Sequence, residues 1–85
     1  MPPSEHRDAD LLLIGRAVRR MREQRGMSAD ELAGAIDMRR ERIDALETGH
    51  LDPTYELLLA LAEGLGMQPS ALMTVAEQLK EENDP

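Results

Sequence analysis

Residues 28–49, SADELAGAIDMRRERIDALETG, constrain the fold of this chain more than any other segment. Their small, apolar and polar residues recur with the spacing of two short helices joined by a brief turn. Ser28 followed by Glu31 is the pattern of a capping box, in which the side chain of each residue accepts a hydrogen bond from the backbone amide of the other residue. At the turn, Asp37 can adopt a left-handed conformation at modest cost. The segment therefore predicts a helix–turn–helix.

The sequence on both sides of this motif predicts three more helices. One is expected to begin near Asp8 or Asp10 and to end at Gly26, because carboxylates suit a helix N-terminus and glycine suits its end. Its buried stripe is formed by four apolar residues at helical spacing: Leu11, Ile14, Val18 and Met21. Another helix covers about residues 54–65, and a last one opens at Pro69. Together these patterns predict an all-α fold, a compact five-helix bundle.

The second helix of the motif is expected over about residues 39–48, with one face toward the core. Ile43 marks that face, and at ~100° per residue three residues lie within about 60° of it: Arg39, Leu46 and Glu47. The residues on the opposite side are Glu41, Ala45 and Thr48, flanked by Arg42 and Asp44. This division predicts which side chains the motif presents to a partner.

Composition excludes several classes of protein. The 85 residues are enough for one domain, predicted over residues 9–80, with a flexible N-terminus at 1–8 and a disordered acidic tail at 81–85. The chain has no cysteine, and its two histidines, His6 and His50, are isolated, so no metal and no cofactor are expected. No nucleophilic cysteine, glycine-rich phosphate loop or enclosed carboxylate pair is present, so no enzyme is expected.

Charge is distributed unevenly along the chain. The formal net charge is -7, but residues 1–42 hold nine arginines against eight acids, whereas residues 43–85 hold one lysine against nine acids. A polyanion responds to the local potential of the docking face, because charges are screened over about 10 Å. The arginine-bearing half is therefore free to bind DNA, and the acidic C-terminal half offers a surface for a protein partner.

Residues 14–72 resemble the Cro and phage-repressor helix–turn–helix family, also called the XRE family. The matching residues occur in the family's order: Ile14, Gly15, Arg22 to Gly26, Ser28, Glu31, Leu32, Ala33, Ile43, Leu46, Glu47, Gly49, Pro53, Leu65 and Gly66. The resemblance implies a lambda-repressor-like DNA-binding domain whose third helix enters the major groove of double-stranded DNA.

The resemblance also assigns roles to individual residues. Those that would face base edges are Arg40, Glu41 and Ala45. Those near the DNA backbone or the edges of the site are Arg39, Arg42 and Thr48. The amides of Ser28, Ala29, Thr54 and Tyr55 would point at phosphates, since helix N-termini attract anions. Arginine binds guanine bidentately and glutamate accepts from cytosine N4, so a site containing G and C is expected. The family pairs the positions of Arg22 and Glu47, which implies a structural salt bridge.

The apolar residues of the last predicted helix have two alternative roles. They either complete the core of one chain or meet a two-fold mate, and family members commonly dimerise through the region after the fourth helix. A homodimer would double the phosphate contacts on a palindromic site. The tentative dimer interface consists of Leu72, Met73, Val75, Ala76 and Leu79.

These observations favour a sequence-specific DNA-binding transcriptional regulator, a repressor rather than an activator. The longest apolar run, residues 11–14, is far too short to cross a bilayer, so no membrane is expected, and the N-terminus lacks the pattern of a signal peptide. The protein is therefore expected in the cytoplasm, nucleoid-associated when bound to DNA. Two alternatives remain: an antitoxin that binds both DNA and a toxin, and a protein-interaction adaptor with weak or no DNA binding.

Overall fold

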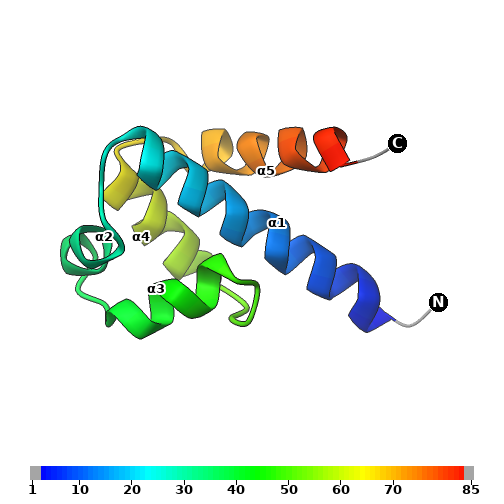
Figure 1. Ribbon diagram of the computed structural model, residues 1–85, viewed down its shortest axis with the longest axis horizontal. Coiled ribbons are helices and arrows are strands. Elements are labelled where there is room, and N and C mark those ends of the chain that lie inside the picture. Colours follow the sequence, from blue (N-terminus) through cyan, green and yellow to red (C-terminus); the bar gives the residue numbers. More distant parts are fainter. Residues whose placement is uncertain (1–2, 84–85) are drawn as a thin grey trace.

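A computed structural model describes the backbone of residues 3–83 and the side chains of residues 9–82, and it contains five helices. In chain order they are α1 (Pro3–Gln24), α2 (Ala29–Ala35), α3 (Arg40–Glu47), α4 (Tyr55–Leu65) and α5 (Pro69–Asn83). The longest helix, α1, runs across the molecule with α5 along one side and α3 along the other, while α2 and α4 close one end (Figure 1). The predicted all-α, five-helix architecture is confirmed.

The N-terminal helix begins at Pro3 rather than near Asp8 or Asp10, so that prediction is wrong. Proline is favourable at the first helical position, because its fixed φ suits the helix and its missing N–H has no partner to lose there. No glycine or further proline follows until Gly15. Of the predicted flexible segment 1–8, residues 3–8 are therefore helical, and residues 1–2 lie outside the described part of the chain.

The last helix also extends further than predicted. It continues through Asn83, so residues 81–83 of the expected disordered tail are helical, and residues 84–85 lie outside the described chain. Lysine and glutamate have high helix propensity, and nothing at residues 80–82 breaks the helix. Glu82 also pairs with Arg20 of α1 at 3.2 Å, which holds the end of α5 against α1.

The core lies between the helices, and aliphatic side chains from all five of them fill it. The largest fully buried side chains are Val18, Leu32, Ile43, Leu46, Leu61, Leu65, Leu72 and Leu79. Burying each of them stabilises the fold by roughly 1.5–3 kcal/mol relative to exposure. Of the stripe predicted for α1, Val18 is fully buried and Met21 packs against the core, but Leu11 and Ile14 are only half-buried. The first half of α1 extends past the core, as Figure 1 shows.

The crossing of α1 and α3 depends on Gly15. A Cβ atom at this position would overlap the carbonyl oxygen of Leu46 and lie 2.9 Å from the carbonyl carbon and 3.0 Å from the Cα of Glu47. All three atoms belong to the α3 backbone, which cannot rotate away as a side chain can. Only glycine permits this close approach, although it costs ~1 kcal/mol of helix propensity relative to alanine.

Candidate nucleic-acid interface

The first helix of the motif, α2, begins with the predicted capping box. The Ser28 hydroxyl accepts from the backbone N–H of Glu31 at 3.0 Å, and the Glu31 carboxylate accepts from the backbone N–H of Ser28, also at 3.0 Å. The Ser28 amide, to which the family resemblance assigns a phosphate contact, is therefore already hydrogen-bonded within the chain. The N–H groups of Ala29 and Asp30 follow it, and the first turn of a helix offers such groups no intrahelical acceptor.

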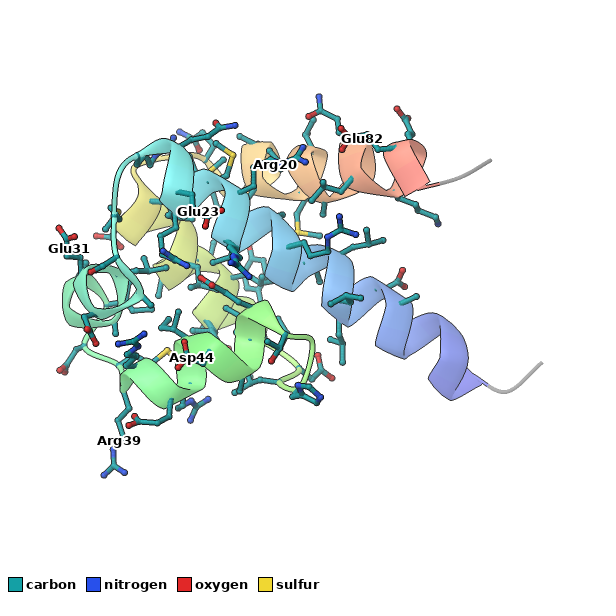
Figure 2. All side chains as sticks on the ribbon, viewed as in Figure 1. Arg20, Glu23, Glu31, Arg39, Asp44 and Glu82 are labelled. Carbon is teal, nitrogen blue, oxygen red and sulfur yellow. The ribbon has the colours of Figure 1, made fainter. Side chains whose placement is uncertain are left out.

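The turn between the two helices of the motif has the predicted left-handed residue. Asp37 has a φ of 55°, and the next amide, that of Met38, donates to the carbonyl oxygen of Ala33 at 2.8 Å. Arg39 then adopts an extended conformation as the N-cap of α3, with φ -75° and ψ 141°. Its position on the helical wheel therefore does not apply, and its side chain extends away from the body (Figure 2). The prediction that Arg39 shares the core face is wrong.

The remaining residues of α3 divide into two faces. Ile43 and Leu46 are completely buried, and Glu47 is 9% exposed. The outer face carries Glu41 and Arg42, both exposed, with Ala45 half-buried beside them and Thr48 exposed at the C-cap. The Thr48 hydroxyl donates to the Asp44 carbonyl oxygen at 2.8 Å and lies 2.9 Å from Nδ1 of His50. One side of α3 thus packs on the core and the other faces solvent.

The expected ion pair between Arg22 and Glu47 is present and nearly buried. The Arg22 Nε and Nη2 groups donate to the two carboxylate oxygens at 2.8 and 2.9 Å, and Nη1 donates to the Met27 carbonyl oxygen at 2.9 Å. The side chains are only 13% and 7% exposed. The hydrogen bond to Glu47 raises the pKa of Arg22 above its ordinary value, against the lowering effect of burial. One guanidinium therefore joins α1, α3 and the loop that precedes α2.

Arg40, the first residue of α3, forms two ion pairs that sequence reasoning missed. Its Nη1 lies 3.2 Å from Oδ2 of Asp30 in α2, and its Nε lies 3.7 Å from Oδ2 of Asp44 one turn along α3. All three side chains are more than half exposed. The i,i+4 spacing of Arg40 and Asp44 is visible in the sequence, whereas the contact with Asp30 depends on how the turn orients the two helices.

A polar hollow lies between α1, α2 and α3. The residues around it are Arg19, Arg22, Ser28, Ala29, Arg40, Asp44, Glu47 and Thr48. Four of the residues predicted to bind DNA therefore gather at one place: Ser28, Ala29, Arg40 and Thr48. The hollow also includes Arg19, which the sequence analysis did not select as a site residue. Its helical spacing from Arg22 was the available signal.

Two predicted phosphate-binding residues lie apart from the hollow, at the start of α4. The Thr54 hydroxyl caps that helix by accepting from the backbone N–H of Leu57 at 3.1 Å. Tyr55 follows as the first helical residue, and its side chain is 70% exposed. Neither residue lines the hollow. The structure thus places the predicted phosphate-facing amides at the starts of two different helices.

The structure corrects the tentative dimer interface on α5. Leu72, Ala76 and Leu79 are between 1% and 6% exposed and belong to the core of the single chain. A helical stripe in the sequence does not reveal what covers it, and here α1 and α4 cover it. Val75 also packs against the core, whereas Met73 is 37% exposed. Of the five residues, Met73 alone remains well exposed for a partner.

No helix within residues 3–83 combines the length and the apolar character that crossing a membrane requires. Among the side chains that the structure describes, no group of three or more histidine, aspartate or glutamate residues is arranged to hold a metal ion.

Comparison with known proteins gives one family and several similar structures. A family model described as a helix-turn-helix domain matches residues 13–73. The restriction-modification controller protein C.AhdI from Aeromonas hydrophila is 30% identical over 75% of this chain and 97% of its own, with a TM-score of 0.73. The clp gene regulator ClgR from C. glutamicum is 27% identical over 82% of this chain and 90% of its own, with a TM-score of 0.76.

A third structure supports the fold alone. A point mutant of the restriction-modification controller protein C.Esp1396I is 19% identical over 88% of this chain and 95% of its own, with a TM-score of 0.83. No curated protein matches the sequence significantly.

Proposed function

This chain belongs to the helix-turn-helix domain family of DNA-binding transcription regulators, which are not enzymes, and we propose that it is a sequence-specific regulator whose α3 enters the major groove. The observation that carries the proposal is the division of α3 into two faces. Ile43 and Leu46 are buried, while Glu41 and Arg42 are exposed on a helix at the molecular surface. Such a helix is able to enter a groove without losing its core contacts.

The proposed base contacts involve three residues at the start and middle of α3. Arg40 is suited to donate two hydrogen bonds to O6 and N7 of guanine, and Glu41 to accept from N4 of cytosine. Ala45 offers a methyl group, which suits contact with a thymine methyl group or close approach of the helix to the bases. A recognition site that contains G and C follows from this set.

The proposed backbone contacts surround these base contacts. Arg39 and Arg42 are exposed cations on either side of Arg40, and Thr48 lies at the other end of α3. The amide of Ala29 at the start of α2 and those of Thr54 and Tyr55 at the start of α4 are the proposed phosphate donors. The Ser28 amide keeps its bond to Glu31, so in this proposal Ser28 contributes its cap rather than a phosphate contact.

The net charge of -7 is compatible with this function because of where the acids lie. The side chains of Glu63, Glu77 and Glu81 are exposed on α4 and α5, and none of them lines the hollow or lies next to Thr54 and Tyr55 in the sequence. Screening with a length of about 10 Å weakens the field of the more distant acids at an approaching phosphate.

We also propose that the protein binds DNA as a homodimer and represses transcription. Two copies related by a two-fold axis would read two half-sites and double the number of phosphate contacts. Met73 supplies an exposed apolar side chain for such a contact. Repression requires only that the bound domains block a promoter, so it needs no additional contact with the transcription machinery.

Selection from a random pool of duplexes, at about 50 and about 200 mM salt, tests this function. We expect one motif to be enriched, with affinity falling by about 10³-fold or more between the two salt concentrations if a dimer makes six or more phosphate contacts. Arg40→Ala should relax preference at one base pair, and Arg42→Ala should weaken binding to all sequences alike. Lys80→Ala on α5 is the matched control and should change neither the base preference nor the affinity for DNA.

The result that would overturn the proposal is the absence of any enriched motif at about 50 mM salt. The adaptor alternative would then be favoured. Uniform weakening by Arg40→Ala would instead reassign Arg40 to a phosphate contact while the regulator function stands. Size-exclusion chromatography with light scattering tests the homodimer, and a monomer on an enriched duplex would contradict it.

A further inference from the structure

We propose that Asp30 and Asp44 are positioning residues for Arg40, which direct this arginine toward a base edge and keep it from binding phosphate. The inference rests on the proposed DNA-binding function and deepens it, because it names what makes the site selective. It concerns one guanidinium and two carboxylates on the surface formed by α2 and α3.

The two carboxylates hold Arg40 from different directions. Asp30 belongs to α2 and contacts Nη1 at 3.2 Å, while Asp44 belongs to α3 and lies 3.7 Å from Nε. Neither contact uses Nη2. Both hydrogens of Nη2 therefore remain available to donate to guanine O6 and N7, and Nη1 carries a second hydrogen besides the one that Asp30 accepts. The acids thus leave one edge of Arg40 available while they restrain the rest of it.

Charge distinguishes the two acceptors that Arg40 would meet on DNA. A phosphate near the guanidinium also meets two carboxylates, so the local charge of the three side chains is negative rather than positive. A guanine edge carries no net charge and is repelled much less. Arg40 therefore gains little from a phosphate and keeps its hydrogen bonds for a base. Within the described residues 9–82, Arg39 and Arg42 form no ion pair, and they remain suited to phosphates.

Stability does not account for these acids. Asp30 and Asp44 are 68% and 56% exposed, and exposed ion pairs contribute little to folding. Arg22 and Glu47 are different, because their side chains are nearly buried and join three segments. Removal of Asp30 and Asp44 should therefore change DNA binding without unfolding the domain.

The test compares the double variant Asp30→Asn with Asp44→Asn against the unmodified chain. Both bind the enriched duplex and a scrambled duplex of equal length at about 50 mM salt. We expect affinity for the scrambled duplex to rise about tenfold and the specificity ratio to fall about tenfold, since phosphate contacts dominate non-specific binding. The control is the double variant Glu63→Gln with Glu81→Gln, which removes the same amount of charge from α4 and α5. Its specificity ratio should change less than about twofold.

A second background shows whether the acids act through Arg40. In chains that carry Arg40→Ala, the two Asn substitutions should leave the specificity ratio unchanged, because no guanidinium remains to be positioned. An equal fall of the ratio with and without Arg40 would overturn the inference. An unchanged specificity ratio in the double variant would also overturn the inference. The proposed function would remain intact in that case if the unmodified chain enriches a motif. If the unmodified chain enriches none, the proposed function fails and the inference with it.

Discussion

Replacing Gly15 by alanine tests the close crossing of α1 and α3. In an exposed helix this change stabilises a protein by up to ~1 kcal/mol, because alanine has the higher helix propensity. Here the new methyl group would overlap the carbonyl oxygen of Leu46 and lie 2.9 Å from the carbonyl carbon of Glu47. Since both atoms belong to the α3 backbone, α1 and α3 would have to move apart along their contact.

The magnitude follows from these opposing effects. Overpacking a core costs about 1–3 kcal/mol and more where the neighbour is rigid, so ~1 kcal/mol of propensity does not compensate for it. We expect Gly15→Ala to lower the free energy of unfolding by about 2 kcal/mol. For a domain of this size that corresponds to a fall in Tm of roughly 8–16 °C. Thermal unfolding followed by circular dichroism at 222 nm measures it.

Gly34→Ala is the matched control. Gly34 also lies in a helix, α2, but a Cβ atom there has no neighbour within 4 Å among the described atoms. This variant should gain up to ~1 kcal/mol, so the two identical substitutions should shift Tm in opposite directions. A Gly15→Ala variant that is as stable as Gly34→Ala would refute the close crossing and the placement of α3 that depends on it.

Substitutions at three further positions test the local structure of the motif, each by thermal or chemical unfolding. Glu47→Gln should cost about 3 kcal/mol by leaving the Arg22 guanidinium nearly buried without its charge partner. Because the raised pKa keeps Arg22 charged in the folded chain, the loss of stability should be the same at about pH 6 and about pH 9. A loss of stability that vanished by about pH 9 would contradict the pairing. Ser28→Ala should cost about 1 kcal/mol through the lost cap, and Ser28→Thr should recover most of it. Asp37→Gly should stabilise the fold by about 0.5 kcal/mol, since φ is 55° there; a loss would show that the Asp37 side chain matters more than its backbone conformation.

The sequence predicted the features that depend on neighbouring residues. The capping box of Ser28 and Glu31 and the left-handed Asp37 follow from contacts within a few positions of each other. The Arg22–Glu47 pair spans 25 residues, and it was expected because the family resemblance paired these positions.

The features that depend on tertiary structure were not predictable in the same way. Arg39 does not lie on the core face because its backbone is extended, whereas a helical wheel assumes a helical backbone. Leu11 is only half-buried because α1 continues past the helices that would cover it. The contact between Asp30 and Arg40 required the angle between α2 and α3, which periodicity does not give. The assignment of base-reading residues stays a prediction until DNA binding is measured.

The two faces of α3 have a consequence for changing the target of this protein. Because Ile43 and Leu46 carry the packing while Glu41 and Arg42 are exposed, an engineer is able to exchange outward residues with little effect on folding. Arg40 is the exception, since its side chain is tied to an acid on the other helix of the motif. A library of variants in α3 alone would keep the Asp30 carboxylate after its partner Arg40 has been replaced. Retargeting therefore calls for varying Asp30 together with Arg40, so that the unit of redesign spans two helices.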